Sequence, residues 1–157
     1  MKHLLLTTIA AVVLVGTAFA DPIHDAARDG DLAGVQAELD KGVDVNEVDR
    51  GFYNLTPLHW AKSKGVAELL ISEGADVNAK DTFGKTTLDW VSIIIYASEP
   101  SEDKAARKET ATLLREHGGK HGTIHGAAAG GDVEAVKEFL AAGVDANATS
   151  ELFEQTP

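Results

Sequence analysis

A five-residue motif occurs three times in this 157-residue chain, and it constrains the fold more than any other feature. The copies are Gly-Val-Asp-Val-Asn at 42–46, Gly-Ala-Asp-Val-Asn at 74–78 and Gly-Val-Asp-Ala-Asn at 143–147. Each copy follows a short stretch with helical apolar spacing, as at Val35 and Leu39. A motif that returns in this way predicts stacked repeat units, because one such unit cannot bury its apolar face alone.

A second recurring element lies before each motif. In its fullest form it is Thr-Pro-Leu-His-Trp-Ala, where Thr56 suits a helix N-cap and Pro57 suits the first helical position. Asp21 and Pro22 are expected to repeat this device. Glycine and aspartate before the second apolar stretch, as at Gly30 and Asp31, predict the end of one helix and the cap of the next. The related elements lie at 22–27, 56–61, 86–91 (a divergent copy) and 123–128.

Together the two elements resemble the ankyrin repeat, whose pattern is matched nearly in full over 56–78. The resemblance covers about 21–157. It implies an all-α solenoid of stacked helix–turn–helix units with β-hairpin fingers. We expect repeats one to four at about 21–49, 50–81, 82–122 and 123–149, and the start of a fifth at 150–157.

The predicted repeats differ in length. His59 is 15 positions before Gly74, whereas His24 is 18 positions before Gly42, so repeat two is expected to lack nearly a helical turn. Repeat three is longer: a first helix is predicted through 96, then an insertion at 92–102 and a charged helix at 103–116. Residues 23–46 also align with 124–147 at a constant offset, and the echo continues to the last residues. We therefore expect a fragment of a longer solenoid.

Residues 1–20 predict a cleaved signal peptide. A short positive start is followed by an apolar stretch at 4–15 and by Ala18-Phe19-Ala20, a small-x-small cleavage site. The alternative is a transmembrane helix, which needs roughly 20 apolar residues. Asp21 and Pro22 end this stretch, and no positive flank follows. The sequence thus predicts a signal-peptide helix, and a mature protein that is periplasmic or secreted and not bound to a membrane.

Composition excludes several classes of function. The formal charge of −11 argues against a nucleic-acid partner, which requires a basic face, and favours a basic partner if charge is used at all. The absence of cysteine excludes disulfides and thiolate sites. No phosphate loop, nucleophile elbow or dinucleotide fingerprint occurs, so we expect no cofactor and no catalysis.

Histidines form two sets with different interpretations. His24, His59 and His125 share one repeat position, so each is expected to bond a neighbouring turn in a structural row. His117, His121 and His125 have the i, i+4, i+8 spacing of helical metal ligands. Glycines between them disfavour a continuous helix, and we expect no metal site.

The resemblance implies that partners contact the fingertips and the concave face of the inner helices. Aromatic side chains and arginine there are typical of binding hot spots. The alternative is that Phe52 and Tyr53 pack the longer finger of repeat two. Trp60 and Trp90 share one repeat position and are expected to pack. The candidate partner-binding residues are Arg50, Phe52, Tyr53, Ser63, Lys64, Thr82, Phe83 and Lys85, with Ser63 and Lys64 expected at the end of an inner helix.

The sequence therefore predicts a monomeric, non-catalytic scaffold that binds a protein. Two alternatives stay open. The repeats would be the targeting module of an enzyme whose catalytic domain follows residue 157, or an inhibitor that protects a neighbouring enzyme.

Overall fold

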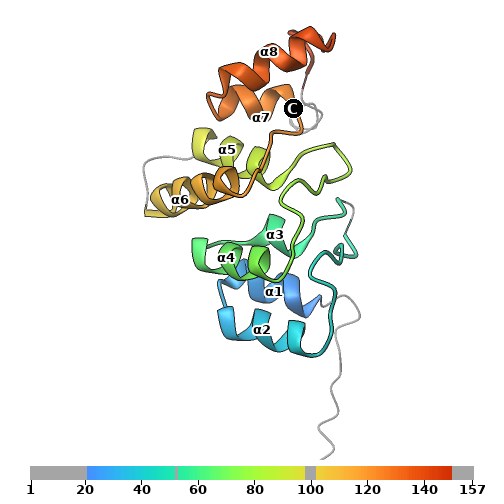
Figure 1. Ribbon diagram of the computed structural model, residues 1–157, viewed down its shortest axis with the longest axis vertical. Coiled ribbons are helices and arrows are strands. Elements are labelled where there is room, and N and C mark those ends of the chain that lie inside the picture. Colours follow the sequence, from blue (N-terminus) through green and yellow to red (C-terminus); the bar gives the residue numbers. More distant parts are fainter. Residues whose placement is uncertain (1–20, 52, 98–101, 150–157) are drawn as a thin grey trace, which may run out of the picture.

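Four helix pairs stack along one axis in the computed structural model, which describes residues 21–51, 53–97 and 102–149 (Figure 1). The inner helices contact one another in the order α1, α3, α5, α7, and the outer helices in the order α2, α4, α6. This confirms the all-α repeat architecture. The predicted signal peptide, Phe52, part of the insertion and the fifth repeat lie outside the described residues. The helices are α1 (Pro22–Asp29), α2 (Leu32–Asp40), α3 (Pro57–Trp60), α4 (Lys64–Ser72), α5 (Thr87–Ala97), α6 (Glu102–Glu116), α7 (Ile124–Ala129) and α8 (Val133–Ala141).

Several helix ends in the described residues follow the predicted capping chemistry. Asp31 accepts a hydrogen bond from the backbone of Gly34 at 3.0 Å and so caps α2. The motif glycine ends α4 with a φ of 94° at Gly74, a left-handed conformation that glycine adopts without strain. Pro22 begins α1 as expected. The Asp21 side chain does not cap α1, however, because it accepts from the N–H of Arg50 at 2.9 Å instead.

The asparagine of the repeated motif joins one repeat to the next. Asn46 donates from Nδ2 to the carbonyl of Gly74 (3.3 Å) and accepts at Oδ1 from the N–H of Asp76 (2.8 Å). Asn78 makes the same pair of bonds to Gly118 and Lys120, at 3.1 and 2.8 Å. Each side chain thus pairs with one carbonyl and one N–H in the turn that follows the outer helix of the next repeat. The motif therefore recurs because it sets the spacing between repeats as well as the turn.

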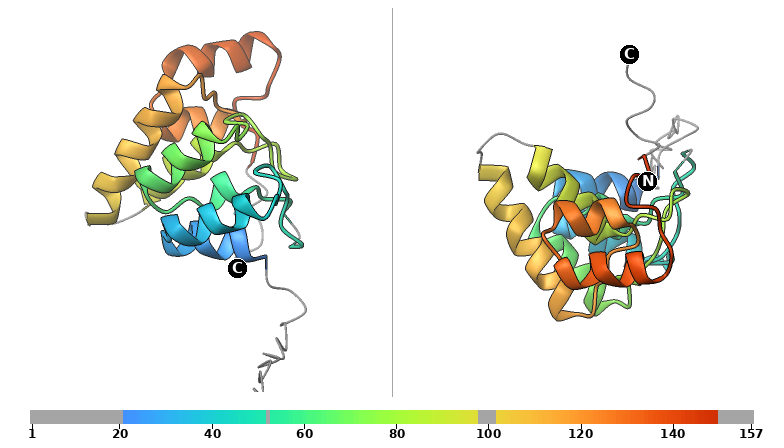
Figure 2. Two further views of the ribbon diagram at one scale, coloured as in Figure 1. Left: turned by 60° about the horizontal axis from the view of Figure 1, so that its bottom comes forward. Right: turned by 90° about the horizontal axis from the view of Figure 1, so that it is seen from above.

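The fingers follow a hairpin course without forming strands in the described part of the chain. The second finger (residues 49–55) is closed by Asp49 N–H donating to the Leu55 carbonyl at 2.8 Å. Asp81 N–H donates in the same way to Lys85 across the third finger (residues 81–85), at 2.9 Å. The N–H of Thr82 then donates to the carbonyl of Tyr53 at 3.0 Å, so the two fingers are hydrogen-bonded to each other. Figure 2 shows them on one side of the stack, opposite the projecting end of α6.

The described helices differ in length in the direction that the sequence predicts. Helix α3 has 4 residues, whereas its neighbours α1 and α5 have 8 and 11. The charged helix α6 has 15 residues and is the longest outer helix described. Because α3 stops after about one turn, the inner row is incomplete between the far ends of α1 and α5.

A buried carboxylate holds repeats three and four together. Asp89 replaces the histidine of the other repeats and is 0 % exposed. Its Oδ1 lies 2.7 Å from Nδ1 of His121, whose side chain is also 0 % exposed. Its Oδ2 accepts from the N–H of Gly122 at 2.9 Å, and Thr86 and Thr123 complete the set at 3.2 and 3.3 Å. Helix α5 is thereby tied to the segment that leads into α7.

Among the outer helices that the structure describes, α8 of repeat four leaves its apolar side chains most exposed. Val35 of α2 is 0 % exposed beneath α4, whereas Val133 and Leu140 of α8 are 61 % and 43 % exposed. Local opening costs least where few apolar contacts must be broken. We therefore expect faster amide hydrogen exchange over 132–141 than over 32–40, measured by mass spectrometry at neutral pH. Equal protection of the two segments would contradict this.

Substitution of Gly126 tests the buried carboxylate. A β-carbon at this position of α7 would overlap the Asp89 carboxylate. Gly126→Ala is expected to destabilise the protein by about 2–3 kcal/mol, as overpacking does in a tight core. The matched control is Gly65→Ala on α4, where a β-carbon would meet Leu32 at an ordinary 3.6 Å. The control should be neutral or stabilising by up to about 1 kcal/mol, because alanine favours a helix. Urea unfolding of both variants measures this, and equal midpoints would refute it.

Candidate functional site

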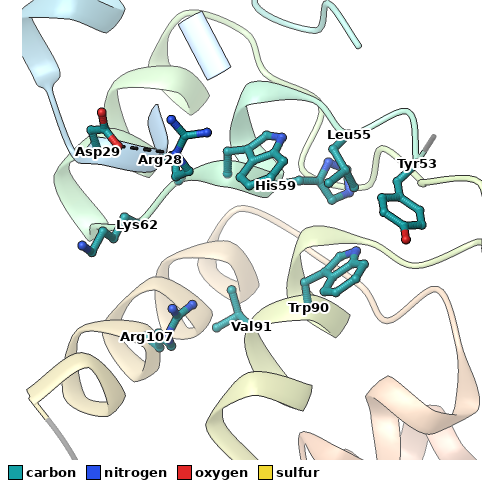
Figure 3. A pocket seen from close by; sticks show the side chains of 11 residues that line it. Arg28, Asp29, Tyr53, Leu55, His59, Lys62, Trp90, Val91 and Arg107 are labelled. Carbon is teal, nitrogen blue, oxygen red and sulfur yellow. Dashed lines mark ion pairs between the residues drawn. The ribbon is translucent and has the colours of Figure 1, made fainter. Parts of the chain in front are cut away.

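A cavity of about 600 Å³ opens where α3 ends (Figure 3). We call it the α3 cavity. The end of α1 and the first turns of α5 form its two sides, and α6 and the second finger complete it. It occupies the space that a longer α3 would fill, so the shortening of repeat two creates it. Its lining residues are Arg28, Asp29, Tyr53, Leu55, His59, Trp60, Ala61, Lys62, Trp90, Val91 and Arg107.

The two tryptophans give the cavity aromatic walls held by the fingers. The indole N–H of Trp60 donates to Asp49 at 3.1 Å, and that of Trp90 donates to Asp81 at 2.8 Å. Both side chains are half-buried. They therefore pack against the fingers, as the sequence predicts, and also present ring surface to the cavity. The aspartates fix the orientation of these rings.

Tyr53 and Phe83 extend the aromatic surface across the two fingers. Their ring centroids are 5.5 Å apart, and Tyr53 is 46 % exposed. Figure 3 shows Tyr53 beside Trp90 at one end of the cavity. Lys85 lies beneath this patch, with its ammonium 5.0 Å from the centroid of Phe83 and 5.9 Å from that of Trp90. Lys85 thus supports the rings through cation–π contacts.

Cationic side chains line the other end of the cavity (Figure 3). The Arg28 guanidinium lies 2.7 Å from Asp25 and 5.8 Å from the centroid of Trp60. Lys62 and Arg107 form no ion pair within the described residues. Arg107 lies on the long helix α6 and lines the cavity past the point where α3 ends.

The histidine row has a structural role. His24 Nε2 lies 3.0 and 3.1 Å from the carbonyls of Glu47 and Leu55, and His125 Nε2 lies 2.7 Å from that of Ala148. These bonds to neighbouring turns confirm the prediction for His24 and His125.

His59 belongs to the same row and lines the α3 cavity. Burial lowers the pKa of His59 below its ordinary value of 6.5, against the opposing charges of Asp81 and Asp49. Its Nδ1 accepts from the N–H of Thr56 at 3.2 Å, which requires this nitrogen to be unprotonated. The neutral ring therefore holds the start of α3 in place.

Some predicted binding residues lie at the cavity or next to it. Tyr53 lines it, Phe83 packs on Tyr53, and Thr82 is exposed on the third finger. Arg50 is exposed on the second finger, with its Nε 3.6 Å from Asp21, and lines a separate cavity of about 400 Å³. Phe52 lies outside the described residues.

The remaining predicted residues are placed differently. Lys85 is only 4 % exposed, so its expected place on the binding surface is wrong; its stem is covered by the rings it supports. Ser63 and Lys64 do not end an inner helix, because α3 stops at Trp60. Ser63 instead caps α4 by accepting from Val66 at 3.3 Å, and Lys64 pairs with Glu68 at 3.3 Å. The sequence analysis did not identify Arg28, Lys62 and Arg107 as candidate site residues. The missing helical turn of repeat two was the signal that could have indicated a cavity there.

The described residues hold no group of three or more metal-ligating side chains. His117 is exposed, while His121 and His125 bond separate partners, Asp89 and Ala148. None of the helices in the described ranges is both long and apolar enough to cross a membrane.

Comparison with known proteins matches the ankyrin repeat family over residues 53–82. A palmitoyltransferase of Debaryomyces hansenii is 37% identical over 70 residues, which is 43% of this chain and 8% of that protein. A serine/threonine-protein kinase of Arabidopsis thaliana is 32% identical over 98 residues, 60% of this chain and 18% of the kinase. An ankyrin repeat-containing protein of Schizosaccharomyces pombe is 39% identical over 66 residues, 40% of this chain and 31% of that protein. The matches thus span less than one third of each relative.

The matched residues include the end of the second finger, α3 and α4, and the same pattern recurs in the stacked helix pairs on either side. The chain is an ankyrin-repeat protein.

Proposed function

We propose that this chain is a non-catalytic scaffold that holds a protein partner against its second and third fingers and the α3 cavity. Ankyrin repeats are protein–protein interaction modules, and the family is typically non-catalytic. The observation that carries the proposal is the continuous aromatic surface of Tyr53, Phe83 and Trp90 at the mouth of a cavity. Large aromatic side chains beside a pocket are the usual anchors of protein interfaces.

The surface is rigid before binding. Asp49 and Asp81 hold the two indoles, and the hydrogen bond from Thr82 to Tyr53 joins the fingers. A preformed surface loses little conformational entropy when a partner binds. The partner is therefore expected to bind without rearrangement of the repeats, and one copy of the chain is sufficient to form the surface.

A second candidate function is supported by the relatives. The palmitoyltransferase and the kinase match this chain over only 8% and 18% of their lengths, so in both proteins a similar segment is a small part of an enzyme. On this alternative the repeats would target a catalytic domain. The partner surface would be the same.

We also propose that the protein is exported. Cleavage after Ala20 would remove none of the described helices, because the first of them begins at Pro22. The partner would then be met in the periplasm or outside the cell.

Truncation of Tyr53 tests the binding surface. With a partner purified on the wild-type chain, Tyr53→Ala is expected to raise Kd about tenfold or more, as for a buried aromatic hot spot. Tyr53→Phe keeps the ring and should retain most of the affinity, and the exposed Lys137→Ala on α8 serves as a distant control. Isothermal titration calorimetry measures Kd, and thermal unfolding shows that each variant is folded. A folded Tyr53→Ala protein that binds as wild type would refute the surface.

A further inference from the structure

We infer that the α3 cavity binds an acidic peptide segment, taking an apolar side chain between the aromatic walls and Asp or Glu carboxylates at its cationic end. This inference rests on the proposed function and specifies the partner's chemistry. It depends on the charges that line the cavity, on their position relative to the aromatic rings, and on their freedom from internal partners.

The charge of the cavity is opposite to that of the chain. The whole protein has 14 Lys and Arg against 25 Asp and Glu. The cavity is lined by Arg28, Lys62 and Arg107 but by the single carboxylate of Asp29. A partly enclosed site with low-dielectric walls strengthens the local field over that of distant surface charges. An anionic group is therefore favoured here although the protein as a whole is acidic.

Two of the three cations have no ion-pair partner among the residues that the structure describes. Arg28 is already paired with Asp25 and Asp29. Lys62 is exposed and Arg107 half-buried, and neither forms an ion pair within the described ranges. They come from opposite sides of the cavity, one after α3 and the other on α6 (Figure 3). A carboxylate between them would gain charge-assisted hydrogen bonds without breaking existing ones.

The aromatic end does not favour a cationic ligand. Trp90 and Phe83 already face the ammonium of Lys85, and Trp60 faces the guanidinium of Arg28. A lysine or methylated-lysine side chain would meet like charges at these rings. The exposed edge of Tyr53 leaves room for an apolar side chain instead. The aromatic end of the cavity next to its cationic end thus matches a peptide segment in which an apolar residue lies near Asp or Glu.

Selection from a random peptide library tests this chemistry. Twelve-residue peptides would be displayed inside Gly-Ser linkers, so that carboxylates come only from Asp and Glu side chains. The bait is the full chain, and a parallel selection uses Tyr53→Ala. The strongest peptide is then synthesised with blocked ends and its Kd measured by fluorescence anisotropy. The variant is the double change Lys62→Glu with Arg107→Glu. Its matched control is Lys41→Glu with Lys137→Glu, which changes the net charge equally at exposed sites outside the cavity.

We expect the selected peptides to be enriched in Asp and Glu beside an apolar residue. Charge reversal at Lys62 and Arg107 should raise Kd about tenfold or more, and the control should change it less than about twofold. Peptides that require Tyr53 but lack acidic residues, or that are rich in Lys, would overturn the inference and leave the binding surface standing. Selected peptides that depend neither on Tyr53 nor on the Lys62 and Arg107 pair would overturn both.

Discussion

The stacking of one helix pair on the next is the constraint on which the whole structure depends. Leu58, Leu70 and Leu114 lie between neighbouring units and are fully buried, although none of these units is large enough to enclose them. Asn46 and Asn78 maintain the spacing of the stack by bonding the backbone of the following repeat. Leu70, Leu114 and the two asparagines lie in the outer helices and the turns that follow them. The inner row can therefore lose a helical turn without collapse of the units on either side. The α3 cavity is the result of that tolerance.

The sequence was sufficient for the elements and insufficient for the site. Helix caps such as Asp31 and terminators such as Gly74 could be predicted because their chemistry is local. The short α3 could also be predicted, by counting residues between recurring positions. The failure of Asp21 to cap α1 could not be predicted. Its carboxylate accepts a hydrogen bond from the backbone of Arg50, which lies in the next repeat. Lys85 was assigned to the surface from its position in a finger, and its burial depends on how Phe83 and Trp90 fold over it.

The local and global charges of the protein lead to different expectations for its partner. A formal charge of −11 favours a basic partner at long range. At the α3 cavity the nearby charges of Lys62 and Arg107 determine the sign of the electrostatic potential instead. Salt at physiological concentration screens the interaction between exposed charges beyond about 8–10 Å, so distant carboxylates contribute little there. The two expectations are compatible if steering and docking involve different parts of the partner. A segment with acidic residues at the cavity and basic residues elsewhere would satisfy both.

The two tryptophans of this chain both line the α3 cavity, so their fluorescence reports its local charge directly. Collisional quenching by iodide and by caesium, each normalised to free N-acetyltryptophanamide and to neutral acrylamide, measures the sign of that charge. The cationic end of the cavity predicts that iodide quenches Trp60 and Trp90 more efficiently than caesium, in spite of the negative net charge. The preference should reverse when Lys62 and Arg107 are changed to glutamate. More efficient quenching by caesium in the wild-type protein would contradict the account.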